Sequence, residues 1–172
     1  MPLIKERATL AIVTGVWDVE TIKKIIPDVE KLPEYRAFLQ RENKSIFNSW
    51  EGVFIERNVN ELFPKITSVC IGNFDSVEKQ FSGGVSPGSH VNGWAWDRNN
   101  LKPVERIVLT DESGKIIGLA QSDQQRPDVS ALYPEVRQNN VGWNGYLRSF
   151  KGRSTAYAVV ENGQAICRLG SL

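Results

Sequence analysis

The side chains best suited to acid–base or metal chemistry are sparse in this sequence. His90 is the only histidine among 172 residues, and the two cysteines, Cys70 and Cys167, lie far apart along the chain. Zinc sites need clustered ligands, and a nucleophile triad needs a Gly-x-Ser-x-Gly elbow or a reactive cysteine near its base. Neither pattern is present. We therefore expect no metal, no cofactor and no catalytic residue, and interpret His90 as a strand residue with ordinary hydrogen bonds.

Carboxylates are the remaining candidates for catalysis. Five of them lie near expected strand ends or loops: Asp97, Asp111, Glu112, Asp123 and Asp128. Two carboxylates facing each other across a cleft can hydrolyse a glycosidic bond, so a carbohydrate hydrolase is an alternative function. The simpler explanation is turn chemistry, in which Asp111 opens a hairpin and Asp97 binds the backbone of the residues that follow it. The oxygens of residues 97–100 are too few to hold calcium.

Aromatic residues give a more specific indication. Trp143 and Tyr146 lie close together with Asn144 between them and glycines on either side. A β-sheet protein holds a sugar by stacking its ring on a flat aromatic side chain while amides bind its hydroxyls. Trp143, Asn144 and Tyr146 are therefore our predicted glycan platform, with core burial as the alternative for Trp143. Trp94 and Trp96 project from one face of a strand, and we assign them to the core.

Helical periodicity covers the first quarter of the chain. It predicts helices over Lys5–Val16, over Val19–Ile26 and from Asp28 to about Asn43. Leu32, Tyr35, Phe38 and Leu39 share one face of the third helix, which we expect to pack on the rest of the protein or on a second copy. Residues 1–45 are thus predicted to be a helical lead-in.

From about Ile46 the hydrophobic period changes to two, and turn residues recur about every ten positions. This predicts an antiparallel β-sandwich, jelly-roll-like, over residues 46–172, and hence a mainly β fold. The long connection Ser122–Asn140 is a candidate surface for docking another protein. The expected strands are Val53–Arg57, Lys65–Gly72, Val77–Phe81, His90–Trp96, Val104–Thr110, Lys115–Gln121, Gly142–Arg148, Ser154–Val160 and Gln164–Leu169.

Composition excludes several classes of protein. The formal net charge is +1, and no basic stripe of the kind that attracts nucleic acid is visible. No run approaches the ~20 apolar residues that cross a bilayer. The first residues lack the cationic and apolar regions of an export signal. We expect a single soluble globular domain with a helical appendage and no nucleic-acid partner.

Two local features bear on how the fold is held together. Cys70 and Cys167 each lie in an alternating run, and they are either a disulfide between neighbouring strands or two buried thiols. In the turn Arg126-Pro127-Asp128-Val129, the proline extends Arg126, and Asp128 can accept a hydrogen bond from the backbone. We interpret Arg126 and Asp128 as a structural latch in which Arg126 pairs with a nearby carboxylate.

Several short motifs occur in a familiar order. Gly93-Trp94-Ala95-Trp96-Asp97 is followed by a hairpin at Asp111–Gly118, then by Arg126-Pro127-Asp128-Val129 and by Gly142-Trp143-Asn144-Gly145. This order resembles a β-sandwich module at the C-terminus of bacterial polytopic membrane proteins of the surface-polysaccharide and glycosyltransferase type, over about residues 20–170, including Ser45–Phe47. The resemblance implies a place on the outer face of the cytoplasmic membrane or in the periplasm, where oxidising conditions favour the disulfide. It supplies no catalytic residues.

We therefore expect a non-catalytic, extracytoplasmic module of a membrane protein that binds glycan or packs on the membrane domain of its own parent chain. The alternatives are a carbohydrate hydrolase with two carboxylates and a protein-docking module. Exposed aromatic rings favour glycan binding, facing carboxylates favour hydrolysis, and a broad apolar patch favours docking.

Overall fold

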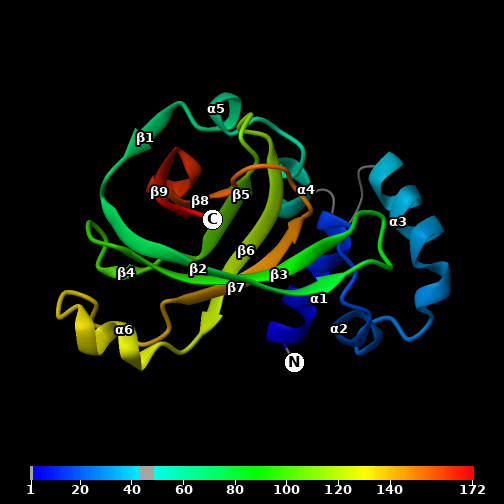
Figure 1. Cartoon of the computed structure of the whole chain (residues 1–172), viewed down its shortest axis with the longest axis horizontal. Helices are drawn as coiled ribbons and strands as arrows, with labels where there is room; N and C mark the ends of the chain where they lie inside the picture. Colours follow the sequence, from blue (N-terminus) through cyan, green and yellow to red (C-terminus); the bar gives the residue numbers. More distant parts are fainter. Residues whose placement is uncertain (1, 43–48) are drawn as a thin grey trace.

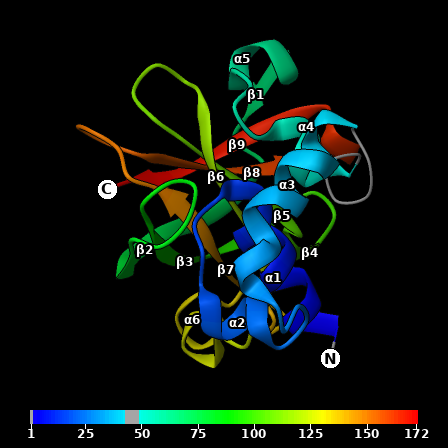
Figure 2. The same cartoon turned by 90° about the vertical axis from the view of Figure 1, so that its right-hand side faces the viewer.

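The computed structural model describes residues 2–42 and 49–172, in which helices pack on one side of a strongly curled β-sheet (Figures 1 and 2). Three predictions touch residues outside these ranges. They are the helix end near Asn43, the domain boundary between residues 45 and 46, and the Ser45–Phe47 part of the resemblance.

The helical part is longer and more divided than the sequence predicts. It comprises α1 (Pro2–Thr14), α2 (Val19–Lys23), a 3-10 turn η1 (Val29–Lys31), α3 (Leu32–Arg41), α4 (Trp50–Phe54) and α5 (Val59–Leu62). The predicted strand Val53–Arg57 is wrong, because α4 occupies its first half. Contacts between aromatic rings favour the helical conformation of this segment. Phe54 packs edge-on against Trp50, one helical turn earlier, and against Phe63.

The strands form one mixed sheet of nine, in the order β1-β9-β8-β5-β6-β7-β3-β2, with β4 paired to β3. All neighbours are antiparallel except β1 and β9. The strands are β1 (Lys65–Thr67), β2 (Cys70–Phe81), β3 (Gly88–Asp97), β4 (Lys102–Pro103), β5 (Arg106–Thr110), β6 (Ile116–Gln124), β7 (Gly142–Arg148), β8 (Thr155–Val160) and β9 (Ala165–Ser171). A short helix α6 (Pro127–Leu132) lies in the long connection, and the 3-10 turn η3 (Glu161–Gly163) joins β8 to β9.

The sheet curls into a half-barrel that brings its two ends together. β2 lies at one end of the strand order, yet it contacts β8 and β9 near the other end (Figure 1). The structure confirms a mainly β fold. Because the strands belong to one curled mixed sheet, it does not confirm the antiparallel two-layer sandwich with jelly-roll topology.

Apolar residues fill both sides of the curled sheet. Ile107 and Leu109 of β5 point into the curl, where they join Trp143 and Leu147 of β7 in an inner core. Val108 points outward into a second core shared with the helices. Alternation along the strands produces both cores, since successive side chains point to opposite faces.

The helical lead-in is fixed to the outer face of β6 and β7 by α1. Two arginines bind the carbonyl groups at the C-terminus of α1, which have no partner inside the helix. The Arg36 guanidinium donates to Ile12 O at 2.8 Å and to Val13 O at 2.9 Å, and Arg148 Nε donates to Thr14 O at 2.6 Å.

This use of Arg36 changes the predicted packing of α3. Its buried face is formed by Leu32, Arg36 and Leu39, whereas Tyr35 and Phe38 are 50% and 45% exposed. Tyr35 and Phe38 therefore do not pack on the rest of the protein, and the other alternative, packing on a second copy, stays a prediction. An arginine that reaches the end of α1 occupies the position expected for an apolar side chain.

Candidate functional site

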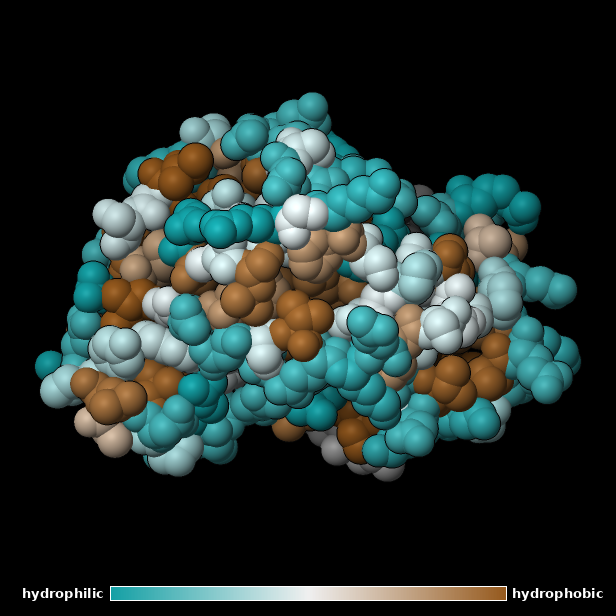
Figure 3. Space-filling view, viewed as in Figure 1, coloured by the Kyte–Doolittle hydropathy of each residue, from teal (hydrophilic) through white to brown (hydrophobic). Residues whose placement is uncertain are grey.

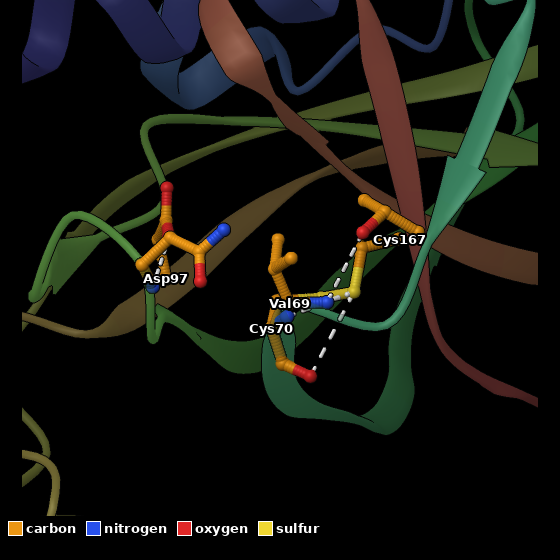
Figure 4. Close-up of a disulfide and its surroundings, with 6 residues drawn as sticks. Val69, Cys70, Asp97 and Cys167 are labelled. Atoms are coloured by element: carbon orange, nitrogen blue, oxygen red, sulfur yellow. Dashed lines mark hydrogen bonds between the residues drawn. A yellow bond between two sulfur atoms is a disulfide. The ribbon is translucent and has the colours of Figure 1, made fainter.

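Cys70 of β2 and Cys167 of β9 are joined in a disulfide with their Cα atoms 6.2 Å apart (Figure 4). Of the two alternatives left open by the sequence, the structure has the bridge. Both residues are buried, and the bond links the two strands where the ends of the curled sheet meet. It closes a loop of 97 residues along the chain.

The predicted glycan platform on β7 is buried. Trp143 and Asn144 are 0% exposed and Tyr146 is 1% exposed. Trp143 points into the inner core against Phe74, while Asn144 and Tyr146 point outward beneath the helical lead-in. No sugar ring can stack on an indole that solvent does not reach, so the platform prediction is corrected to core burial.

The glycines around this platform do not make room for a ligand. Gly93 is the cross-strand partner of Trp143, and a Cβ atom there would collide with the indole. At Gly145 a Cβ atom would collide with the backbone oxygen of Leu119. These glycines leave room for the protein's own neighbouring strands rather than for a ligand.

The turn at Arg126 is a latch of the predicted kind. Arg126 precedes α6, donates to both oxygens of Asp128, and reaches Asp75 Oδ2 of β2 from Nη1 at 2.6 Å. The paired carboxylates hold the pKa of Arg126 above its usual value, with the hydrogen bond to Asp128 as the main cause. Arg126 thus ties α6 to β2.

Each of the five candidate carboxylates forms hydrogen bonds or an ion pair with a neighbouring group of the protein. Asp97 accepts bonds from the backbone of Asn99 and Asn100, and Asp111 accepts from the backbone of Ser113. The other three bind as follows: Glu112 accepts from Arg153 N, Asp123 pairs with Arg7, and Asp128 pairs with Arg126. For Asp97 and Asp111 these contacts are the turn chemistry that the sequence offers as the simpler explanation.

Electrostatics also argues against a general acid among these groups. Every described carboxyl group whose pKa clearly departs from its ordinary value has a lowered pKa; these groups are Asp18, Glu56, Glu78, Asp111, Asp128 and Glu135. For Asp111, desolvation acts to raise the pKa, but hydrogen bonds from Ser113 and Lys115 outweigh it. The acid of a glycosidase needs the opposite shift, a raised pKa.

Three bulges cluster at one part of the outer face of the sheet. Two interrupt β2 at Asp75 and Lys79, and one interrupts β6 at Asp123. They are three of five register shifts among the described strand pairs. Bulges redirect side chains and are frequent beside functional sites. Lys79 adopts a φ of 26°, which is rare for a residue with a side chain.

Between these bulges lies a group of polar side chains that we call the polar strip: Ser76 and Glu78 of β2, and His90 and Asn92 of β3. Ser76 is the cross-strand partner of Asn92, and Glu78 is that of His90. Asn92 Nδ2 donates to Ser76 Oγ at 2.9 Å, and Ser76 Oγ donates to Glu78 Oε1 at 2.9 Å. The donors therefore point toward Glu78, and among the described residues Asn92 Oδ1 accepts no hydrogen bond.

His90 is held by a second chain of polar groups. Asn144 Nδ2 donates to Asp123 Oδ1, so Asn144 Oδ1 faces His90 Nε2, 3.3 Å away. Because that oxygen can only accept, Nε2 is the donor, and in the neutral tautomer that carries this proton Nδ1 is an acceptor. Arg7 Nε completes the chain by donating to Asp123 Oδ2 at 2.7 Å. The ordinary role predicted for His90 thus includes a fixed orientation.

One end of the polar strip is aromatic. Trp94 follows Asn92 on the same face of β3, and Tyr133 lies over it with ring centroids 4.9 Å apart. Trp94 is 6% exposed, whereas Tyr133 is 43% exposed. Trp94 is buried as predicted, but it lies on the outer face under the α6 connection, with Trp96, Val129, Val136 and Val141. The exposed ring beside it is Tyr133.

The sequence did not identify Ser76, Glu78, Asn92 or Tyr133 as site residues. Alternation places Asn92 and Trp94 on one face of a strand, which was an available clue. The bulges on β2 could not be predicted from the sequence. The extra residue of a bulge changes which side chains share a face, but no local sequence pattern indicates where it occurs.

Two hollows lie outside the polar strip. A pocket of about 610 Å³ lies at one end of the sheet, where the turn from β3 to β4 faces the turn from β8 to β9; Asp97, Lys102, Glu105, Arg106 and Asn162 are among its lining residues. A shallower groove of about 380 Å³ on the helical lead-in is lined by Ile25, Ile26, Leu32 and Tyr35. Figure 3 shows hydrophobic residues at the surface near α2.

Two searches of the described residues gave negative results. None of the described helices is both long and apolar enough to span a bilayer. Within residues 2–42 and 49–172, no three histidine, cysteine, aspartate or glutamate side chains are grouped closely enough to hold a metal ion.

We compared the chain with protein-family models, with curated protein sequences and with solved structures, and none of the three comparisons gave a match.

Proposed function

We propose that this domain is a non-catalytic module that binds glycan through the polar strip and its aromatic end. The observation that carries the proposal is the hydrogen-bonded chain from Asn92 through Ser76 to Glu78, next to the half-exposed ring of Tyr133. Elsewhere on the outer face, apolar side chains lie under the helical lead-in or under α6. The polar strip lies between these two covered areas (Figure 1).

The dimensions and chemistry of the strip suit a short oligosaccharide. From His90 to Trp94 the strand β3 extends about 13 Å, at about 3.3 Å per residue. A sugar ring can stack on Tyr133 while its hydroxyls donate to Asn92 Oδ1 and His90 Nδ1. Polar side chains already ordered by their neighbours lose little entropy on binding. The module then needs no catalytic group.

The cellular setting is part of the same proposal. We place the module outside the cytoplasm as part of a membrane protein, and the Cys70–Cys167 disulfide supports an oxidising compartment. Its partner on the membrane side is the membrane domain of its own parent chain. We further propose that the two facing halves of the curled sheet correspond to the two layers of the antiparallel jelly-roll sandwich expected from the sequence.

A protein-docking role is the second candidate. Leu132, in the long connection, is 76% exposed. Binding contacts are often made by long surface connections, and Leu132 at the end of α6 supplies exposed apolar surface in this one. It lies next to Tyr133, so both candidate functions use the α6 connection.

A glycan array followed by calorimetry tests the glycan proposal. The variants Asn92→Ala and Tyr133→Ala should each abolish or strongly weaken binding of any oligosaccharide that the wild-type protein recognises. Tyr35→Ala is the matched control, because Tyr35 is 50% exposed on α3 and should leave binding unchanged.

Two results would overturn the glycan proposal. One is the absence of binding to any oligosaccharide on the array. The other is binding that Asn92→Ala and Tyr133→Ala leave intact. Loss of oligosaccharide binding in Leu132→Ala with Tyr133→Ala unaffected would place the glycan contact outside the polar strip and also overturn the proposal.

A further inference from the structure

The surroundings of the polar strip carry an excess of negative charge, although the whole chain has a formal net charge of +1. Glu78 lies in the strip, and the other charged groups lie beside it and are connected to one another or to the strip by ion pairs and hydrogen bonds. Together with Glu78, they comprise three cations, Arg7, Lys79 and Arg126, and four further carboxylates, Glu20, Asp75, Asp123 and Asp128. Positive charge is therefore concentrated elsewhere on the molecule.

The cations do not offset this excess within the strip itself. Arg7 pairs with Asp123, whose side chain is fully buried, and Arg126 lies between Asp75 and Asp128. Lys79 lies 3.9 Å from Glu20, away from the centre of the strip, with its ammonium over the ring of Phe81. Glu78 has no ion pair among the described residues. Hydrogen bonds from Ser76 and Asn92 hold its pKa below the usual value, so it is ionised at neutral pH.

The atoms left to meet a ligand are mainly acceptors. Asn92 Oδ1, the carboxylate of Glu78 and, in the neutral ring, His90 Nδ1 can accept hydrogen bonds. The donors of the strip face protein partners: Asn92 Nδ2 donates to Ser76, Ser76 Oγ to Glu78, and His90 Nε2 to Asn144. An ammonium group carries three donors and no acceptor, so it complements this arrangement better than a carboxylate does. A carboxylate would meet like charge and unpaired acceptors.

We infer that the polar strip selects glycans whose sugars carry free amino groups, such as deacetylated hexosamine oligomers, over neutral and acidic glycans. This inference rests on the proposed glycan function and adds the class of sugar. The ring of Tyr133 provides the sugar specificity through stacking, and Glu78 with its acidic surroundings provides the charge specificity.

Calorimetry with three tetrasaccharides of equal length tests the inference: a fully deacetylated glucosamine oligomer, its N-acetylated form, and an oligogalacturonate. At low salt the deacetylated form should bind about tenfold more tightly than the acetylated form, from several weak surface charge interactions. The oligogalacturonate should not bind measurably. Raising the salt concentration should reduce the preference, because surface charges are screened.

Variants separate charge from stacking. Glu78→Gln should reduce the preference for the deacetylated form about threefold to fivefold, the effect of one exposed ion pair. Glu34→Gln makes the same change of charge on the exposed side of α3 and should leave the preference intact. Tyr133→Ala should weaken binding of both the acetylated and the deacetylated oligomers.

Each contrary outcome has a distinct meaning. If no tetrasaccharide binds, the proposed function fails and the inference fails with it. If the acetylated and deacetylated forms bind equally, glycan binding stands and the inference is wrong. If tetralysine, with the same charge, binds as tightly as the deacetylated oligomer and Tyr133→Ala affects neither, the strip is a general site for cations, and the inference is again wrong.

Discussion

Strands β7 and β3 lie side by side and both place amide and aromatic side chains on the outer face of the sheet, yet at the positions where Asn144 and Tyr146 pair with Asn92 and His90, only the side chains of β7 are covered. On β7, Asn144 and Tyr146 are buried beneath the helical lead-in. On β3, their partners Asn92 and His90 are only half-buried. The difference arises because α1 packs on β6 and β7. Alternation shows which side chains share a face, and the position of the helices decides which of them a ligand can reach.

The largest effect should come from the covered strand. Trp143→Ala should lower the free energy of unfolding by about 3 to 5 kcal/mol, because the cavity left in the inner core cannot refill. Urea denaturation measures it. Trp143→Phe is the control and should cost about 1 to 2 kcal/mol, because the indole N–H has no hydrogen-bond partner to lose among the described residues. An unchanged midpoint in Trp143→Ala would show that β7 is not part of the core.

The disulfide should have the next largest effect, because it holds β2, which carries half of the polar strip, against β9. Replacing both Cys70 and Cys167 with alanine should cost about 2 to 4 kcal/mol of stability by releasing a long loop in the unfolded chain. Reduction of the wild-type protein should reproduce the loss. Equal urea midpoints for the oxidised and reduced forms would contradict this expectation.

A smaller, pH-dependent effect is expected where the helical lead-in meets β7. Desolvation acts to raise the pKa of Asp18, but hydrogen bonds from Thr21 and Tyr146 outweigh it and hold this pKa below the usual value. The stabilisation is therefore present above the unfolded-state pKa and is lost as the pH falls through the folded-state pKa.

Tyr146→Phe should cost about 1.5 kcal/mol at pH 7, the contribution of a hydrogen bond to a charged group. Its stability should converge with that of the wild type as the pH falls and Asp18 becomes protonated. Urea denaturation over a pH series measures both quantities, with Tyr35→Phe as a control that should have no effect. A loss of stability that stays constant down to low pH would assign the effect to packing instead of to Asp18.

The smallest effect on stability should come from the uncovered strand. Asn92→Ala should change the free energy of unfolding by less than about 1 kcal/mol, because its side chain makes hydrogen bonds only within the polar strip at the surface. Measured beside Trp143→Ala, it gives the contrast between β3 and β7 directly. A cost equal to that of Trp143→Ala would mean that the polar strip is structural.

Local patterns were sufficient to predict most of the strands after residue 64 and the turn at Arg126. The segment Gly142–Arg148 was predicted with its observed bounds, because alternation and flanking turn residues act over a few positions. The pairing of Arg126 with a carboxylate was predicted without naming the partner, and the structure supplies Asp75 and Asp128. The Cys70–Cys167 pairing was one of two alternatives that the sequence left open.

Features that depend on the whole fold were not predicted. Nothing local distinguishes an indole that stacks on sugar from one that fills a core, and Trp143 was assigned incorrectly for that reason. The curl of a single sheet arises from contacts between strands distant in sequence, and the bulges at Asp75 and Lys79 in the β2–β3 pair leave no local sequence mark. Trp50–Phe54 became a helix because aromatic contacts overrode its strand-like composition.

The position of β9 has a consequence for how the chain acquires its shape during synthesis. It is the last of the nine strands in sequence, yet it lies between β8 and β1, and β1 precedes it by about 100 residues. A growing chain therefore cannot complete the sheet until β9 has emerged from the ribosome. Until then β1 and Cys70 lack their partners, and the inner core stays open. Such late, long-range pairing makes folding slow and leaves the unfinished chain prone to aggregation.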